Sequence, residues 1–158
     1  MKFEFTGEVK VIFGVTLQRI KKASSGDLGG WIEKESNLDA SGNAWVSGDA
    51  QVSGNAWVYG DAQVSGNAWV SGDAQVYGDA WVYGDAQVAW FSKVGSRIAT
   101  LTVAQSKEKN TLLVFTGCFS GTLTEFEAAV EKTHGATKYG NEYRALIAYI
   151  KIRFEVAT

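Results

Sequence analysis

Proline is absent from this 158-residue chain, so its turns depend on other residues. The 18 glycines let the backbone turn through positive φ angles instead. The single cysteine, Cys118, excludes an intrachain disulfide and a cysteine-rich zinc site. Such sparing use of cysteine is typical of a reducing compartment, which favours the cytoplasm.

Long apolar runs are also missing. No segment approaches the roughly 20 apolar residues that a transmembrane helix needs. The first ten residues, MKFEFTGEVK, alternate charged and apolar side chains, unlike the apolar core of a signal peptide. Because 46% of the residues are hydrophobic, the chain has enough apolar surface for a globular core. The sequence therefore predicts a soluble cytoplasmic protein that does not contact a membrane.

Positive charge is missing from the middle of the chain. Residues 36–90 contain no lysine or arginine. Their charged residues are Asp39, Asp49, Asp61, Asp73, Asp79 and Asp85. The whole chain has a net charge of −2, so the two flanks together carry +4. Since neutralising phosphates requires lysine and arginine, this middle segment is not expected to bind nucleic acid directly.

The middle segment consists of a six-residue repeat, or hexad. Eight hexads run without a gap through residues 42–89: GNAWVS, GDAQVS, GNAWVY, GDAQVS, GNAWVS, GDAQVY, GDAWVY and GDAQVA. Two degenerate hexads, residues 30–35 and 36–41, are expected to precede them in the same phase. Alternation along a strand places Ala44 and Val46 on one face and Trp45 on the other. Glycine with Asn or Asp then turns each corner.

The repeat resembles the hexapeptide-repeat, left-handed parallel β-helix family, in which an aliphatic residue precedes a small one by four positions, as Val46 precedes Ala50. The resemblance implies a left-handed coil with three hexads, or 18 residues, per turn. Tyr59 and Tyr77 are 18 residues apart and should therefore stack on one face, whereas Tyr83 does not fit this spacing.

Stacking at this period places Trp and Gln alternately along each face. The predicted columns include Trp45 with Gln63 and Trp81, and Trp69 with Gln51 and Gln87. Asp is mostly stacked on Asn, which avoids carboxylate repulsion, and Asp61 over Asp79 is the one like-charge stack expected. Two interpretations remain open: the pattern serves strand cohesion, or the outward tryptophans form a binding surface.

The predicted fold is mainly β: an N-terminal β-hairpin and cap over residues 1–30, a β-helix over residues 31–90, and a C-terminal α+β unit over residues 91–158. The hairpin spans residues 2–20 with its turn at residues 6–8. A loop over residues 21–30 leads to Trp31 and Ile32, which cap the open core. The apolar patterns predict strands at residues 98–104 and 112–118 around a turn at residues 107–110.

Two helices are expected to follow. A capping box at Thr122 and Glu125 starts the first, Leu123, Phe126 and Val130 line its buried face, and a glycine at position 135 ends it. A second helical stripe runs over residues 143–150. Residues beyond position 150 fit helix and strand equally well.

The tail GCFSGTLTEFEAAVEKTHG and the segment LGGWIE are similar to uncharacterised proteins of bacteriophages and prophages that carry the same hexads. This resemblance implies a phage origin and a partner in the bacterial host. Many enzymes of the hexapeptide family are acyltransferases that resemble one another in a catalytic histidine near a coil and a loop protruding from the helix. Here the one histidine, His134, lies outside the hexads, and the hexads have no insertion, so acyl transfer is not expected.

His134 is instead expected to interact with the carbonyls at the end of a helix. Cys118 lies in an apolar strand pattern and is expected to be buried rather than to act as a nucleophile with His134. The sequence shows no phosphate-binding loop and no histidine–carboxylate cluster for a metal. Neither an enzyme activity nor a cofactor is therefore expected.

Two non-enzymatic hypotheses remain. In the first, the protein is a binding scaffold, for example an anti-CRISPR-like inhibitor of a host defence protein. Its predicted contact residues are Trp45, Trp57, Trp69, Trp81, Tyr59, Tyr77 and Tyr83. In the second, the acidic corners imitate DNA and occupy a nucleic-acid-binding protein. The predicted acidic column consists of Asp49, Asp61, Asp73, Asp79 and Asp85. The outward tryptophans also favour a homo-oligomer.

Overall fold

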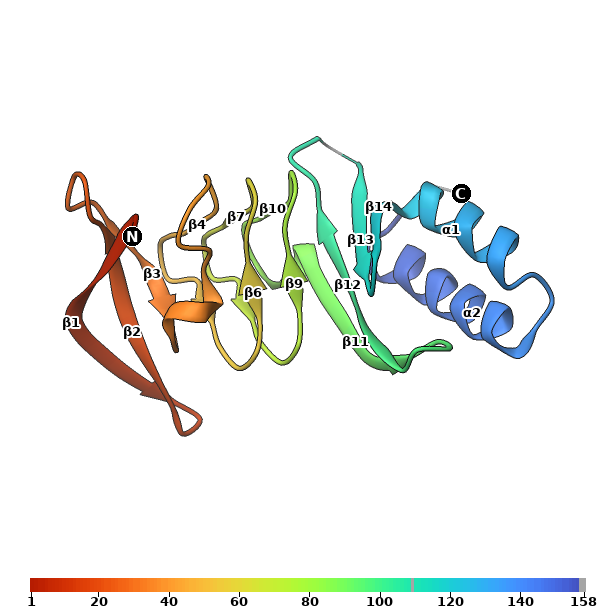
Figure 1. The fold of residues 1–158 in the computed structure, drawn as a ribbon, viewed down its shortest axis with the longest axis horizontal. Helices are drawn as coiled ribbons and strands as arrows, with labels where there is room; N and C mark the ends of the chain where they lie inside the picture. Colours follow the sequence, from red (N-terminus) through yellow and green to blue (C-terminus); the bar gives the residue numbers. More distant parts are fainter. Residues whose placement is uncertain (109, 157–158) are drawn as a thin grey trace.

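The computed structural model describes residues 1–108 and 110–156. The molecule is elongated, and its parts follow one another along the long axis in sequence order (Figure 1). An N-terminal hairpin is followed by a coil of short parallel strands, then by an antiparallel sheet, and finally by a pair of helices.

The N-terminal hairpin consists of β1 (Phe3–Ile12) and β2 (Val15–Lys22), as predicted. Its turn lies at Phe13 and Gly14, so the predicted turn at residues 6–8 is wrong. Gly7 instead lies in a bulge of β1, which absorbs the extra residues and lets the strand continue.

The loop predicted over residues 21–30 is wrong at both ends, since β2 runs to Lys22 and β3 (Leu28–Ile32) begins at Leu28. This strand pairs antiparallel with β2 and parallel with β5, and so joins the hairpin to the coil. Gly30 lies in close contact with the coil, since a Cβ there would come within 2.7 Å of a Val46 methyl group. Glycine is therefore needed where β3 meets β4.

Seven hexads form the rungs of the coil, each a two-residue strand: β4 (Trp45–Val46), β5 (Gln51–Val52), β6 (Trp57–Val58), β7 (Gln63–Val64), β8 (Trp69–Val70), β9 (Gln75–Val76) and β10 (Trp81–Val82). Strands 18 residues apart pair in parallel, as β4 with β7 and β7 with β10. Three hexads therefore close one turn, as expected. The Ala and Val side chains of these hexads are at most 1% exposed, which confirms that they face inward.

The two degenerate hexads belong to the coil in a different phase from the predicted one. Ile32 pairs with Val52 and Leu38 bridges to Val58, so each is offset by 20 residues rather than 18. Ile32 and Leu38 occupy valine positions and are 0% and 2% exposed. Ile32 is thus part of the first rung rather than a lid over it. The first coil is longer because it contains a 3₁₀ turn, η1 (Glu35–Asn37).

The eighth hexad leaves the coil. Gly84 is extended (φ −173°) and is followed by the 3₁₀ turn η2 (Asp85–Gln87), so the predicted stacking of Gln87 on Trp69 is wrong. The side chains of this hexad protect the end of the coil instead. The Asp85 carboxylate accepts the Trp69 N–H at 2.8 Å, and Gln87 Oε1 accepts the Tyr83 N–H at 2.8 Å. Backbone donors at an open edge thereby find acceptors within the same chain.

An antiparallel sheet covers the end of the coil. Its strand order is β11 (Val88–Val94), β12 (Ala99–Gln105), β13 (Leu112–Thr116) and β14 (Phe119–Thr122). The pattern predicted β12 and β13 but missed the two outer strands; their predicted turn includes Lys109, which lies outside the described residues. One face of the sheet places Ala104 and Phe115 in the core of the coil. The other places Leu101 and Val114 against the helices, so the central strands are buried on both sides.

The two helices are α1 (Leu123–Thr133) and α2 (Lys138–Arg153). The predicted capping box is confirmed, because Glu125 N–H donates to Thr122 Oγ1 and Thr122 N–H donates to a Glu125 carboxylate oxygen, each at 3.1 Å. Helix α2 continues past the predicted end at position 150. A strand would place Ile150 and Ile152 on one face, but they are 0% and 79% exposed. No helix in the described part of the chain is long and apolar enough to cross a membrane.

Candidate functional site

Four aromatic rings pack in a continuous row that runs along the face made by β6 and β9 and ends at the sheet. Tyr59 and Tyr77 stack with ring centroids 4.4 Å apart and an interplanar angle of 15°, as predicted. Trp57 stacks on Tyr59 at 3.9 Å, and Phe115 of β13 packs on Tyr77 at 4.1 Å. We call this set of Trp57, Tyr59, Tyr77 and Phe115 the aromatic ladder. It begins at a tryptophan that is 41% exposed and ends at a phenylalanine that is buried.

The coil imposes the spacing of the aromatic ladder. Tyr59 and Tyr77 each follow an inward valine, and the Tyr59 N–H donates to the Val76 carbonyl at 3.0 Å, which holds the two corners in register. Rungs lie about 4.8 Å apart in such a sheet, close to the separation at which aromatic rings stack. Burial and the neighbouring Tyr77 phenol raise the pKa of Tyr59 from 10.0 to about 12. The Tyr59 phenol is therefore protonated and uncharged at neutral pH.

The other predicted aromatic contact residues lie apart from the ladder. Trp69 stacks against Phe13 of the hairpin turn at 5.7 Å, and Trp81 meets Tyr83 edge to face at 5.7 Å. Trp45 is half-buried, with the ammonium group of a lysine 5.6 Å from its ring. The predicted residues are thus spread around the coil, and Trp57, Tyr59 and Tyr77 form the largest group of them in continuous contact.

The acidic corners are exposed but are not all alike. Asn43 donates its side-chain N–H to the Asp61 carboxylate at 2.9 Å, and Asn55 donates to Asp73 at 3.1 Å, which confirms the predicted stacking of Asn on Asp. Asp49 and Asp79 also lie exposed at corners of the coil. Asp85 is not a corner residue, since it belongs to η2. The predicted acidic column therefore loses this member.

Cys118 is exposed, so its predicted burial is wrong. Strand β13 ends at Thr116, and the cysteine lies in the turn before β14, where the strand alternation no longer applies. His134 donates its backbone N–H to Val130 O at 2.9 Å, but its imidazole packs near Tyr143 with ring centroids 5.4 Å apart. The predicted contact of the His134 side chain with helix carbonyls is therefore wrong, because the ring contacts Tyr143 instead.

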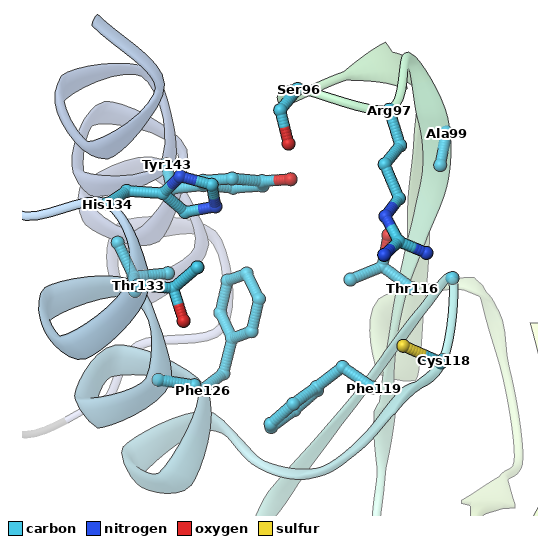
Figure 2. Close-up of a pocket in the computed structure, with 13 residues that line it drawn as sticks. Ser96, Arg97, Ala99, Thr116, Cys118, Phe119, Phe126, Thr133, His134 and Tyr143 are labelled. Carbon is cyan, nitrogen blue, oxygen red and sulfur yellow. The ribbon is translucent and has the colours of Figure 1, made fainter. Parts of the chain in front are cut away.

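Cys118 and His134 line the same cavity from different walls (Figure 2). Sequence analysis considered them as a pair but did not place them around a cavity. No group of three or more His, Cys, Asp or Glu side chains that could hold a metal ion occurs in residues 1–108 and 110–156.

Sequence analysis missed two aromatic residues of these surfaces, Phe13 and Phe115. The alternation of Leu113 and Phe115 with Val114 was a signal that Phe115 lies on the opposite sheet face from Val114, but not that this face covers the coil. Phe13 carried no comparable signal because the turn was predicted elsewhere.

Comparison with known families is consistent with this geometry. Residues 50–63, 62–75 and 74–89 match a family model described as the YdcK beta solenoid repeat. The chain carries β-solenoid repeats. Successive matches begin 12 residues apart, which is the length of one Trp hexad plus one Gln hexad. No curated protein and no solved structure matches this chain.

Proposed function

We propose that this β-solenoid protein is a non-enzymatic scaffold that binds a partner protein through the aromatic ladder. The observation that supports this function best is the continuous stack from Trp57 through Tyr59 to Tyr77. Large aromatic side chains dominate the energy of many protein interfaces. Here backbone hydrogen bonds hold the rings on a regular coil, as in the bond from Trp57 N–H to Ala74 O at 3.0 Å. A preorganised surface of this kind loses little conformational entropy on binding.

The charge around the aromatic ladder limits the kind of partner that fits. The ladder lies between two corners of the coil, one carrying Asp73 and the other carrying Asp61 and Asp79. All three aspartates are exposed, and residues 36–90 contain no lysine or arginine. A protein surface with an apolar pocket and a basic rim would complement this arrangement.

Resemblance to known sequences supports three further parts of the proposal: the phage origin, the host partner and the handedness of the coil. The similarity of residues 28–33 and 117–135 to phage and prophage proteins supports a phage-encoded protein that acts in the host cytoplasm. We propose that its partner is a host protein, with an antiviral defence protein as the target in the manner of an anti-CRISPR. The hexad pattern supports a left-handed coil, and an experimental structure would test that handedness directly.

Replacing Trp57 by alanine is expected to weaken partner binding about 30-fold, because a central aromatic contributes about 2 kcal/mol to such an interface. The partner would first be captured from host lysate on the immobilised protein and identified by mass spectrometry. Its Kd would then be measured for each variant by calorimetry. Tyr149→Ala is the matched control, since Tyr149 is also an exposed aromatic residue but lies on α2, outside the ladder.

The alternative function, a mimic of DNA, predicts the opposite pattern. The test is a triple change of Asp61, Asp73 and Asp79 to Asn; Asp85 is left intact because it protects the Trp69 N–H. For the scaffold, we expect the triple variant to weaken binding less than Trp57→Ala does. Loss of binding in the folded triple variant, with Trp57→Ala still binding and a steep salt dependence, would favour the mimic.

We also propose that the protein forms a homo-oligomer through exposed aromatic surface on the coil. Trp69, Trp81 and Tyr83 are 38%, 36% and 48% exposed and lie away from the ladder. Light scattering at micromolar concentration is expected to give at least twice the monomer mass of 17.1 kDa. A monomeric mass across that concentration range would rule out this self-association.

A further inference from the structure

A cavity of about 300 Å³ lies in the C-terminal unit, away from the coil. Residues from two turns of the sheet and from the two helices line this open cavity. Arg97 comes from the turn between β11 and β12, Cys118 from the turn between β13 and β14, and His134 from the end of α1 (Figure 2). The aromatic ladder contributes no residue to this cavity, so its chemistry is independent of the proposed scaffold.

Aromatic side chains form a rigid wall of the cavity. Phe126 packs edge to face with Phe119 at 5.2 Å and with Tyr143 at 5.5 Å. Phe126 and Tyr143 are only 4% and 8% exposed, so core packing holds their positions. Gly95 makes room for this wall, because a Cβ at that position would overlap the Tyr143 hydroxyl. A flat apolar group entering the cavity would meet rings already in place.

One cation extends over the opposite side of the cavity. Figure 2 shows the Arg97 side chain reaching from its turn toward Thr116 and Cys118, across the cavity from Tyr143 and His134. Arg97 forms no ion pair with the residues that the structure describes. None of the thirteen lining residues is acidic. The nearby Glu142 carboxylate is engaged, since it accepts the Gly95 N–H at 2.9 Å.

We propose that this cavity binds a small aromatic carboxylate. The ring would lie against Phe119, Phe126 and Tyr143, and the carboxylate would pair with the Arg97 guanidinium, whose planar fork suits such a group. A volume of about 300 Å³ is at the small end for ligand sites and suits a molecule with a single ring. The site requires an apolar ring and a negative charge together.

Phenylacetate is the probe, with acetate and 2-phenylethanol as matched compounds that lack its ring or its charge. A titration of the ¹⁵N-labelled full chain followed by NMR is expected to show saturable shifts in the amide signals around the cavity. The expected phenylacetate Kd is about 1 mM, a value usual for a ligand of this size. Acetate and 2-phenylethanol should bind about tenfold more weakly. Absence of saturable phenylacetate shifts at these amides would overturn the proposal.

Arg97→Gln separates the charge contact from simple apolar binding. This variant should bind phenylacetate about tenfold more weakly and 2-phenylethanol equally well, because only the charge-assisted contact is lost. Lys93→Gln is the control, since Lys93 is an exposed cation on the neighbouring strand β11 that does not line the cavity. Equal phenylacetate affinity in Arg97→Gln and the parent would refute the assigned role. Neither result depends on partner binding by the ladder.

Discussion

Val64→Asp is expected to destabilise the protein by several kcal/mol and to unfold the coil at or near room temperature. Val64 is 0% exposed and lies between Val46 and Val82 of the adjacent coils. A carboxylate at this position would be buried between two valines in the apolar core, and burying an unpaired charge is very costly. The cost is comparable to the whole stability of a typical domain, about 5–15 kcal/mol. Urea denaturation followed by circular dichroism would measure it.

Gln75→Asp is the matched control for Val64→Asp, because it introduces the same carboxylate on the outer face of the coil. Gln75 is exposed, so the free energy of unfolding should change by no more than about 0.5 kcal/mol. If Val64→Asp denatures at the same urea concentration as the parent, the inward position of the valines is incorrect.

Phe115→Ala is expected to lower the free energy of unfolding by about 3–5 kcal/mol, the range typical of a buried phenylalanine. Phe115 is 3% exposed and joins the core of the coil from strand β13 of the sheet. Its ring also packs on Tyr77, so its loss leaves a cavity where the sheet covers the last turn. Hydrogen exchange should show the largest loss of protection in β9 and β10.

Ile98→Ala provides the comparison for Phe115→Ala. Ile98 lies next to the same sheet but is 68% exposed, so its replacement should change the free energy of unfolding by less than about 0.5 kcal/mol. Unchanged hydrogen exchange in β9 and β10 of Phe115→Ala would mean that the sheet does not stabilise the end of the coil.

The structure of the hexads could be predicted because each has the same inward and outward positions along its strand. Ala44 and Val46 recur in equivalent form in every hexad, and strand alternation alone is enough to place them inside. The pairing of Tyr59 with Tyr77 followed from the same period. Repeats contact mainly their neighbours along the coil, so a local pattern determines the packing.

Where the repeat stops, local pattern was a weaker guide. The last hexad, GDAQVA, matches the repeat in sequence. Its Gly84, however, does not turn a corner, and its Val88 belongs to the sheet. No further coil follows to pair with this hexad, and the sheet provides an alternative partner for its strand. Ile32 and Leu38 took valine positions in a different phase for a related reason, since burial of the largest apolar side chain outweighs the spacing.

The candidate sites were only partly predictable. Sequence position indicated that the tryptophans point outward, but Trp69 meets Phe13 while Trp57 meets Tyr59, and these contacts depend on the hairpin and the corners. The cavity beside Cys118 and His134 depends on two turns and two helices that are distant in sequence.

The amino-acid sequence by itself determined the hexads, their alanine and valine interior, and the capped helix that starts after Thr122, and its resemblance to hexapeptide-repeat proteins implied the three hexads per turn. These features follow from contacts at short or regular separations along the chain. Only the tertiary structure decided that Phe115 completes the aromatic ladder and that Arg97 faces an aromatic cavity. Those arrangements arise where segments without a shared period pack together, and no local propensity specifies which side chains meet there.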